Sequence, residues 1–184
     1  MSKVYFTSDL HFGHDNLIKG LRGMTTQESD SLIISNWNKT IGKRDVVYLL
    51  GDITMEKASL IYPYLSQLNG TIIVVAGNHD TPPCCRAITA MGIQMVGNIS
   101  YKGYILSHVP LHESQVDFTR GNIHGHLHLQ GHIEGHIQVH EDSFQTQLGD
   151  KYFNVNTEFH NYTPIAFDEI VKRFNKRKDG REKI

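Results

Sequence analysis

The sequence predicts an α/β fold, because short apolar runs rich in Val, Ile and Tyr alternate with longer polar stretches. Hydrophobic residues make up 39% of the chain and charged residues 20%, which is the range of a soluble globular protein. The 184 residues suffice for one full core, and they contain no internal repeat, linker or domain boundary. We therefore expect a single domain over residues 1–184, and no apolar run is long enough for a membrane span.

The first predicted elements are two strands with a helix between them. Val4–Thr7 is an apolar run that predicts a strand. Residues 26–40 place apolar side chains, including Trp37, at helical spacing after an acidic start, which predicts a helix. Residues 45–50 are apolar again and predict the second strand, directly before a Gly-Asp pair.

The middle of the chain continues this alternation. Residues 58–68 have a helical pattern despite Pro63, and the Asn-Gly pair that follows predicts a turn. Residues 71–76 predict the third strand, and residues 82–91 a short helix.

The second half of the chain predicts shorter strands and a last helix. Residues 99–101 and 104–106 flank a Lys-Gly pair, which indicates a hairpin. Residues 133–139 alternate loosely, as antiparallel strands do, and residues 153–156 predict a last strand. Residues 168–174 predict the final helix.

Side chains of the kind that bind metals follow the ends of five apolar runs. In an open α/β sheet the carboxyl ends of the strands line one crevice, where ligands bind. One such residue at a strand end is ordinary, but residues at all five ends indicate convergence on one site. The residues are Asp9, His11, Asp52, Asn78, His108, His126 and His128.

These seven side chains provide two carboxylates, one amide and four imidazoles, which suit two divalent cations about 3.5–4 Å apart. One carboxylate can bridge the cations through its two oxygens. The charge of two cations exceeds that of two carboxylates, and the surplus suits an anionic phosphoester. Mixed nitrogen and oxygen ligation favours Mn, Fe, Co, Ni or Zn over Mg or Ca. The motifs contain no cysteine, so a structural zinc site is not expected.

In the order of its motifs the sequence resembles the calcineurin-like metallophosphoesterases. The resemblance spans nearly the whole chain, and five motifs in order are far more specific than any one of them. It is closest to the small, single-domain bacterial and phage members, which have motifs similar to residues 9–14, 36–38 and 161–165. The implied fold is a four-layer αββα sandwich of two mixed β-sheets flanked by helices. The motifs are Asp9-x-His11, Gly51-Asp52, Gly77-Asn78-His79-Asp80, His108 and Gly125-His126-x-His128.

The resemblance also implies a role for each residue. The first metal would be bound by Asp9, His11, Asp52 and His128. The second metal would be bound by Asp52, which is shared, and by Asn78, His108 and His126. His79 would face the scissile phosphate and protonate the leaving oxygen, while a hydroxide that bridges the metals attacks in line. We expect Mn as the native metal, with Fe, Zn, Co and Ni as alternatives.

Other polar residues near the motifs have less specific expectations. His14 and Asn16 follow the first motif and are expected to contact the substrate phosphate. His112 is expected to line the cleft, and His124 to support the ligands from behind. Asp80 is expected to cap the helix that follows it. Three further histidines recur every fourth residue, and we expect them in exposed loops or a hairpin: His132, His136 and His140.

The expected reaction is hydrolysis of a small phosphoester, with a nucleotide or a phosphodiester, including cyclic nucleotides, as the leading substrate. The second motif lacks the Gly-Asp-x-x-Asp-Arg-Gly pattern of protein phosphatases, which speaks against a phosphoprotein substrate. The short intervals between motifs leave no room for a capping domain. Two alternatives remain: a nuclease of the same family, and a non-catalytic scaffold that binds partner proteins.

The charge distribution and the cysteines bear on partners and location. The net charge is −1, but residues 169–184 hold seven Lys or Arg against three acids, a local charge of +4 that leaves −5 elsewhere. We expect a solvated basic helix end rather than a nucleic-acid arm, and no nucleic-acid or membrane partner. The chain has only two cysteines and no signal-peptide pattern, so we expect a cytoplasmic protein.

Overall fold

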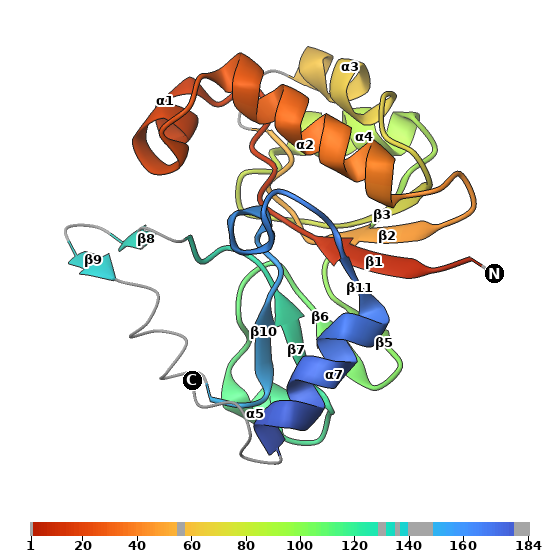
Figure 1. The fold of residues 1–184 in the computed structure, drawn as a ribbon, viewed down its shortest axis with the longest axis vertical. Helices are drawn as coiled ribbons and strands as arrows, with labels where there is room; N and C mark the ends of the chain where they lie inside the picture. The colour runs from red at the N-terminus through yellow and green to blue at the C-terminus, as the bar shows by residue number, and fades with distance from the viewer. Residues whose placement is uncertain (1, 55–57, 129–131, 135–136, 140–148, 179–184) are drawn as a thin grey trace.

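Two mixed β-sheets with helices beside them form the framework of the protein, which we describe from a computed structural model (Figure 1). This arrangement confirms the expected α/β class and its two mixed sheets flanked by helices. The structure describes residues 2–54, 58–128, 132–134, 137–139 and 149–178.

The larger sheet has five strands in the order β11-β1-β2-β3-β4. β1 (Val4–Thr7), β2 (Val46–Leu49), β3 (Thr71–Val75) and β4 (Gln94–Val96) run parallel, and β11 (Ile165–Ala166) pairs antiparallel with β1. The carboxyl ends of β1, β2 and β3 therefore open onto the same edge of the sheet.

The smaller sheet has four strands in the order β10-β7-β6-β5. β5 (Ile99–Tyr101) and β6 (Tyr104–Leu106) form the expected hairpin, while β7 (Gly121–His124) and β10 (Tyr152–Asn154) continue parallel to β6. Both turn residues of the hairpin have positive φ, as a type I′ turn requires. A separate two-stranded sheet pairs β8 (His132–Glu134) antiparallel with β9 (Ile137–Val139).

Helices lie beside both sheets. In Figure 1, α2, α3 and α4 lie together on one side of the five-stranded sheet, and α7 lies beside the four-stranded sheet. None of the described helices is long and apolar enough to cross a membrane. The helical segments are α1 (Asp15–Leu17), the π-helical η1 (Ile18–Arg22), α2 (Thr26–Thr40), η2 (Ala58–Leu60), α3 (Ile61–Leu65), α4 (Pro82–Ala90), α5 (Glu113–Val116), η3 (Thr157–His160) and α7 (Phe167–Lys178).

Two apolar cores hold the layers together, and β2 contributes to both because successive side chains point to opposite faces. Val47 and Leu49 pack into a core that includes residues of α2 and α4, such as Trp37. Tyr48 and Leu50 point the other way, into a core shared with the four-stranded sheet and α7. A strand that is buried on both faces is apolar throughout. For this reason β2 could be predicted from a continuous apolar run in the sequence.

Some predicted elements differ from the structure. The predicted helix at residues 58–68 is wrong in extent, because it is divided into η2 and α3 and ends at Leu65. After that residue the chain tightens into turns, with the Leu68 amide donating to the Leu65 carbonyl at 3.2 Å. His132 lies in β8, and His136 and His140 lie outside the described residues.

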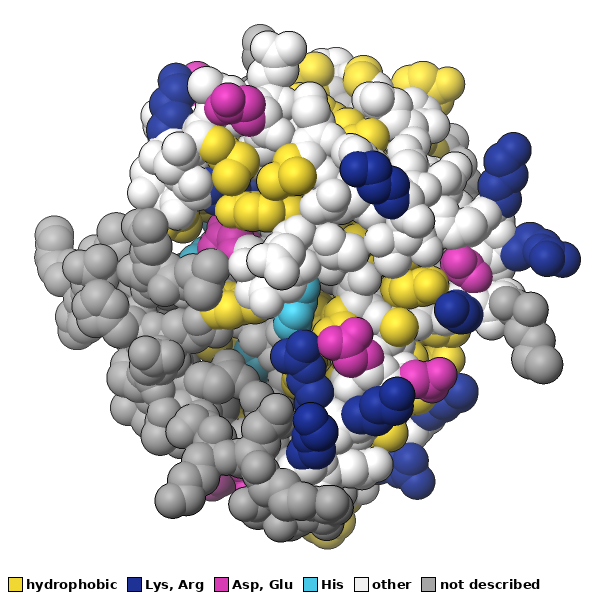
Figure 2. Space-filling view, viewed as in Figure 1, with side chains coloured by type: hydrophobic (Ala, Val, Ile, Leu, Met, Phe, Trp, Pro, Cys, Tyr) yellow, Lys and Arg dark blue, Asp and Glu magenta, His cyan; other side chains and the backbone are white. Residues whose placement is uncertain are grey.

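The basic end of the chain begins as the ordered helix α7. In the view of Figure 2, Lys and Arg side chains gather over this region, with Asp and Glu side chains among them. Arg173 forms an ion pair with Glu169 one turn earlier, at 3.0 Å. Residues 179–184 of the predicted basic end lie outside the described residues.

Candidate metal centre

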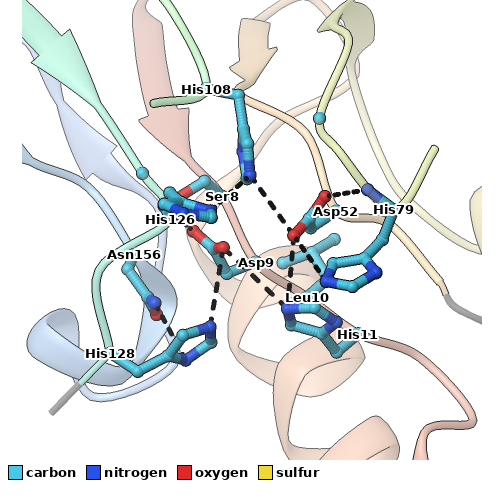
Figure 3. Close-up of polar contacts among 12 residues, drawn as sticks. Ser8, Asp9, Leu10, His11, Asp52, His79, His108, His126, His128 and Asn156 are labelled. Atoms are coloured by element: carbon cyan, nitrogen blue, oxygen red, sulfur yellow. Dashed lines mark hydrogen bonds and ion pairs between the residues drawn. The ribbon is translucent and has the colours of Figure 1, made fainter. Parts of the chain in front are cut away.

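The seven metal-type side chains lie just beyond the carboxyl ends of five strands, as the sequence predicts. The strands belong to two sheets rather than one, because β1, β2 and β3 are in the larger sheet and β6 and β7 in the smaller. Figure 3 shows the two carboxylates between histidine rings that come from both sheets. The loops of two facing sheets therefore meet at this centre.

The first cluster consists of Asp9, His11 and His128, whose candidate ligand atoms lie within 4.8 Å of one another. The Nε2 atoms of both histidines lie 3.9 Å from Asp9 Oδ1. The other oxygen of this carboxylate accepts hydrogen bonds from the Ser8 hydroxyl and, at 2.9 Å, from the His126 amide. One oxygen of Asp9 is thus held by the protein while the other faces the histidines.

The second cluster consists of Asp52, His108 and His126. His108 Nε2 lies 3.3 Å from Asp52 Oδ2 and 3.2 Å from His126 Nδ1. The side-chain oxygen of Asn78 lies 2.8 Å from the same His108 atom, so this amide joins the cluster.

Asp52 lies between the two clusters. Its Oδ2 is 3.7 Å from His11 Nε2 in the first cluster and 3.3 Å from His108 Nε2 in the second. Its Oδ1 instead accepts a hydrogen bond from the His79 amide at 2.9 Å. The Oδ2 atom of Asp52 therefore faces histidines of both clusters, while its Oδ1 atom is held by the backbone.

Several buried atoms of these clusters fit metal ligation. Among the residues that the structure describes, Asp9 Oδ1 and both ring nitrogens of His11 are buried and make no hydrogen bond. A buried polar atom without a partner lowers the stability of the fold, unless a bound ligand interacts with it. Carboxylate oxygens and neutral imidazoles in one cluster suit a transition-metal or zinc ion, so the donor set fits the expected cations.

The backbone at the clusters adopts a rarely populated conformation. Asp9, His11, Asp52 and His126 have φ angles of 57°, 48°, 56° and 72°. Such left-handed residues cost roughly 1 kcal/mol or more each when they are not glycine, and they concentrate at functional sites. Four of the seven described non-glycine residues with positive φ are candidate ligands, so the strain is focused on this centre.

Glycines allow the loops to approach closely around the carboxylates. A Cβ atom at Gly77 would collide with Asp52 Oδ1, and one at Gly125 would collide with the Ser8 hydroxyl and lie 2.5 Å from Asp9 Oδ2. Gly51 has a φ of +83°, and its Cβ would lie 2.6 Å from the Gly77 Cα atom. The motif glycines thus leave the space in which the carboxylates sit.

In the second cluster, the histidine and carboxylate charges each stabilise the ionised form of the other group. Burial opposes the charge on both Asp52 and His108, but their hydrogen bond and mutual attraction outweigh it. The pKa of Asp52 is lowered as a result, and the pKa of His108 is raised to about 9. The His108 Nδ1 atom lies 2.7 Å from the Leu50 carbonyl and donates to it, so Nε2 faces the carboxylate.

In the first cluster the pKa values of Asp9 and His11 shift in the opposite directions, because this cluster is more deeply buried. Burial is the main cause that raises the pKa of Asp9 and that keeps the pKa of His11 well below its ordinary value. A neutral His11 is the form that donates a lone pair to a metal. The pKa of His128 is raised, because its hydrogen bond to Glu158 and the nearby carboxylates outweigh burial.

Glu158 and Arg22 support the first cluster from behind, although no sequence pattern pointed to either residue. Glu158 Oε1 lies 3.0 Å from His128 Nδ1 and 3.1 Å from Arg22 Nε. The buried Arg22 also donates to the carbonyls of Asp9 and Leu10, at 2.7 Å and 3.0 Å. The carboxylate therefore fixes His128 with Nε2 toward Asp9, and the guanidinium holds the loop of the first motif.

Asp80 has a role other than the predicted helix cap. Its carboxylate accepts hydrogen bonds from the amides of Asp52, Ile53 and Gly77, at 3.1, 3.1 and 2.8 Å. The helix α4 begins after Thr81, with no side-chain cap. Asp80 therefore ties the loop after β2 to the loop after β3, and the cap prediction is wrong.

A cavity of about 480 Å³ opens beside the two clusters. His79 lines it, with its Nε2 atom 3.9 Å from Asp52 Oδ2 and its side chain 36% exposed. His14 and Asn16, which were expected to contact the phosphate, also line the cavity. The other polar residues along it are His11, Asp52, His126 and His128.

Two of the expected site residues lie elsewhere. His112 is exposed at the start of α5, where its ring accepts a hydrogen bond from the Ser114 amide at 3.3 Å. His124 is fully buried in β7, and its Nδ1 atom lies 2.8 Å from the Gly125 carbonyl. Neither residue is among the described residues that line the cavity, so the expectation that His112 lines the cleft is not met.

Comparison with known sequences decides the family. The sequence model described as Calcineurin-like phosphoesterase matches residues 2–182. The chain belongs to the calcineurin-like phosphoesterase family. Members of this family are phosphoester hydrolases that bind divalent metals, in agreement with the two clusters of candidate ligands.

Several known proteins are similar to this chain in sequence or in structure. An uncharacterised protein of Methanocaldococcus jannaschii is 33% identical over 185 residues, covering 97% of this chain and 94% of the relative. The Gene 66 protein of Mycobacterium phage L5 is 36% identical over 87 residues, covering 45% of this chain and 42% of the phage protein. A crystal structure of a protein of unknown function from Aquifex aeolicus matches with a TM-score of 0.68 at 26% identity, covering 94% and 99% of the two chains.

Proposed function

We propose that the chain is a phosphoesterase that requires two divalent metals and hydrolyses a P–O bond of a small phosphoester. The observation that carries the proposal is the position of Asp52, whose Oδ2 atom faces one histidine of each cluster at 3.7 and 3.3 Å. A carboxylate shared in this way suits the short metal–metal spacing of two-metal hydrolases.

The candidate ligands are Asp9, His11, Asp52 and His128 for one ion, and Asp52, Asn78, His108 and His126 for the other. The ions, with Mn as our first choice, would neutralise phosphate charge and lower the pKa of bound water. The protein's own contribution is preorganisation. The Ser8 hydroxyl and backbone amides hold one oxygen of each carboxylate, and Leu50 and Glu158 fix the rings of His108 and His128.

His79 is the candidate general acid. Its ring is partly exposed in the cavity and points its Nε2 atom toward Asp52, at a distance of 3.9 Å. Its amide is fixed by Asp52 Oδ1, which positions the ring beside the shared carboxylate. In this role His79 holds a proton at Nε2 and donates it to the leaving oxygen as the ester bond breaks.

A nucleotide or another small phosphodiester is the proposed substrate, including cyclic nucleotides. The cavity volume of about 480 Å³ is in the range of sites for small molecules. Histidine and asparagine side chains line part of the cavity and suit the anionic group of an ester.

The experiment is a hydrolysis screen on manganese-loaded protein. Bis-p-nitrophenyl phosphate, p-nitrophenyl phosphate and a panel of linear and cyclic nucleotides would be tested, with the Asp52→Asn variant as the inactive control. We expect turnover of at least one diester or nucleotide by the wild type alone. Absence of turnover across the panel and across Mn, Co, Ni, Zn and Fe would contradict the proposal.

The same preparation separates the two alternatives. A nuclease would cleave plasmid or oligonucleotide DNA faster than any mononucleotide, although the acidic body of the chain speaks against strong DNA binding. A scaffold would retain little metal after purification and show no turnover. Two metal equivalents per chain together with nucleotide turnover would exclude the scaffold.

A further inference from the structure

One wall of the cavity beside the metal centre is apolar. Leu17, Gly20 and Leu21 form this wall, and the same cavity is lined by polar residues of the two clusters. Leu17 ends α1, and the other two residues belong to η1, so the wall comes from one continuous helical segment. Leucines four residues apart lie on the same face of such a segment, where they form one surface.

Gly20 keeps the space between and above these leucines open. A Cβ atom built at Gly20 would meet no atom within 4 Å, and the residue itself is exposed. The charged neighbour Lys19 instead forms an ion pair with Asp15 at 3.0 Å. Within the described part of the chain, this surface is therefore an open apolar area in the same cavity as the candidate ligands.

The apolar wall is held at a fixed position relative to the metal centre. Arg22 is the last residue of η1, and its buried guanidinium donates to the carbonyls of Asp9 and Leu10. It also donates to the Ser29 hydroxyl at 3.0 Å. The helical segment and the loop that carries the first candidate ligands thus form one hydrogen-bonded unit.

We propose that Leu17, Gly20 and Leu21 form a subsite for a planar aromatic ring on the substrate, such as a nucleobase. The inference rests on the proposed function, because it takes the phosphate to be bound at the two clusters. A group attached to that phosphate would extend along the cavity onto the wall. A flat ring gains by removing both its own face and the leucine side chains from water, whereas a methyl or polyol group has less apolar surface to bury.

The test uses two phosphonates that cannot be hydrolysed, because their P–C bond replaces an ester bond. Binding of phenylphosphonate and methylphosphonate to the manganese-loaded protein would be measured by titration calorimetry. We expect phenylphosphonate to bind about tenfold more tightly or better, the discrimination that an apolar pocket gives for a few carbon atoms.

Matched variants assign this preference to the wall. Leu21→Gln keeps side-chain length and helix propensity but removes the apolar surface, and it should reduce the preference to less than about threefold. Leu17→Gln is a second variant in case the first does not fold. Leu32→Gln makes the same change on α2, where Leu32 is 37% exposed and does not line the cavity. It should retain the wild-type preference.

The outcomes separate the subsite from the reaction. Equal affinity of the wild type for both phosphonates would overturn the subsite, and so would an unchanged preference in the folded wall variants. A preference lost only in the wall variants would support the subsite even if no ester in the hydrolysis screen were turned over. Turnover without any preference for the aromatic ring would leave the proposed function intact and contradict the subsite alone.

Discussion

The two carboxylates of the centre are restrained in the same way, although they follow different strands. In both Asp9 and Asp52, one oxygen accepts a hydrogen bond from a backbone amide while the other oxygen faces histidine nitrogens. A carboxylate held at one oxygen presents the other in a fixed direction. This arrangement prepares the centre for cations before any cation is bound.

Exchanging the shared carboxylate for an amide should affect both clusters. In Asp52→Asn we expect loss of both metal equivalents and of activity, because the amide removes the charge that faces both sets of ligands. Metal content by mass spectrometry and turnover of bis-p-nitrophenyl phosphate would be measured. An active variant with two metals would contradict a shared role for this residue.

Removing the candidate acid should have a narrower effect. In His79→Ala we expect wild-type metal content and a fall in kcat of about 10²–10⁴-fold, as for loss of a general acid. The same two measurements apply. Metal loss equal to that of Asp52→Asn would exclude His79 from the role of acid, because it would then act as a ligand.

Replacing the Glu158 carboxylate tests whether its hydrogen bond to His128 contributes to metal binding. In Glu158→Gln we expect metal affinity to fall about 10–100-fold, because His128 loses the charged partner of its Nδ1–H group. Fluorescence or calorimetric titration with Mn²⁺ would measure this. Glu169→Gln, which removes the charge of Glu169 from its exposed ion pair with Arg173, serves as the control and should bind Mn²⁺ like the wild type.

At the scale of elements, the ends of the strands matter more than their interiors. The loops after β2 and β3 approach so closely that each contains a glycine whose Cβ would contact the other loop. Asp80 then ties these loops together through three backbone amides. The positions of Asp52 and Asn78 are thus set by loop packing as well as by the sheet.

A side chain at Gly51 should disrupt this packing. In Gly51→Ala the new Cβ would lie 2.6 Å from Gly77 and 2.7 Å from His108 Nδ1, at a φ of +83°. We expect the free energy of unfolding to fall by about 2 kcal/mol or more, with weaker metal binding. Gly92→Ala is the matched control, because its φ is +77° and its Cβ would meet no atom within 4 Å. Urea denaturation should show a loss of only about 1 kcal/mol there; equal losses would contradict the packing argument.

The elements that could be predicted from sequence are those with a strong local pattern. α2 has the predicted bounds, because its apolar spacing and acidic start are strong local patterns, and the structure adds a capping box between Thr25 and Glu28. β11 has only two residues, and β7 contains Gly, Asn and His, so the bounds of neither strand could be predicted. The π-helical η1, which forms the apolar wall, likewise has no distinct sequence pattern.

The residues of the candidate site likewise divide into those that local sequence predicts and those that depend on the folded chain. Its metal-type residues were recognisable because each follows a strand, and their order resembles a known family. Glu158 was not recognisable, because its hydrogen bond to Arg22 joins residues 136 positions apart and only the folded chain brings them together. The positive φ values of Asp9 and Asp52 also depend on tertiary contacts.

At the scale of the whole molecule, bound metal should stabilise the fold. A ligand at 100 times its dissociation constant contributes about 2.7 kcal/mol per site, or roughly 5–10 °C in Tm for a chain of this length. We expect calorimetry to show a higher Tm with Mn²⁺ than with EDTA. No difference between these conditions at neutral pH would contradict metal binding by the folded chain.

This stabilisation should grow as pH rises. The pKa of His108 is raised from 6.5 to about 9 in the metal-free fold, mainly through Asp52 against the effect of burial. Its proton therefore stabilises the metal-free protein at low pH, and this contribution is lost as pH rises through about 9. Because a metal must displace that proton, we expect the Tm gain with Mn²⁺ to be larger at pH 8.5 than at pH 6.5. A gain independent of pH would contradict His108 as a ligand.

Each cluster combines a carboxylate that follows a strand of the larger sheet with at least one histidine that follows a strand of the smaller sheet. A nascent chain that has left the ribosome only as far as β4 would carry Asp9, His11 and Asp52, but not His108, His126 or His128. Such an intermediate would lack a full set of donors for either ion. We therefore expect the ions to bind only after both sheets have been synthesised and have packed against each other.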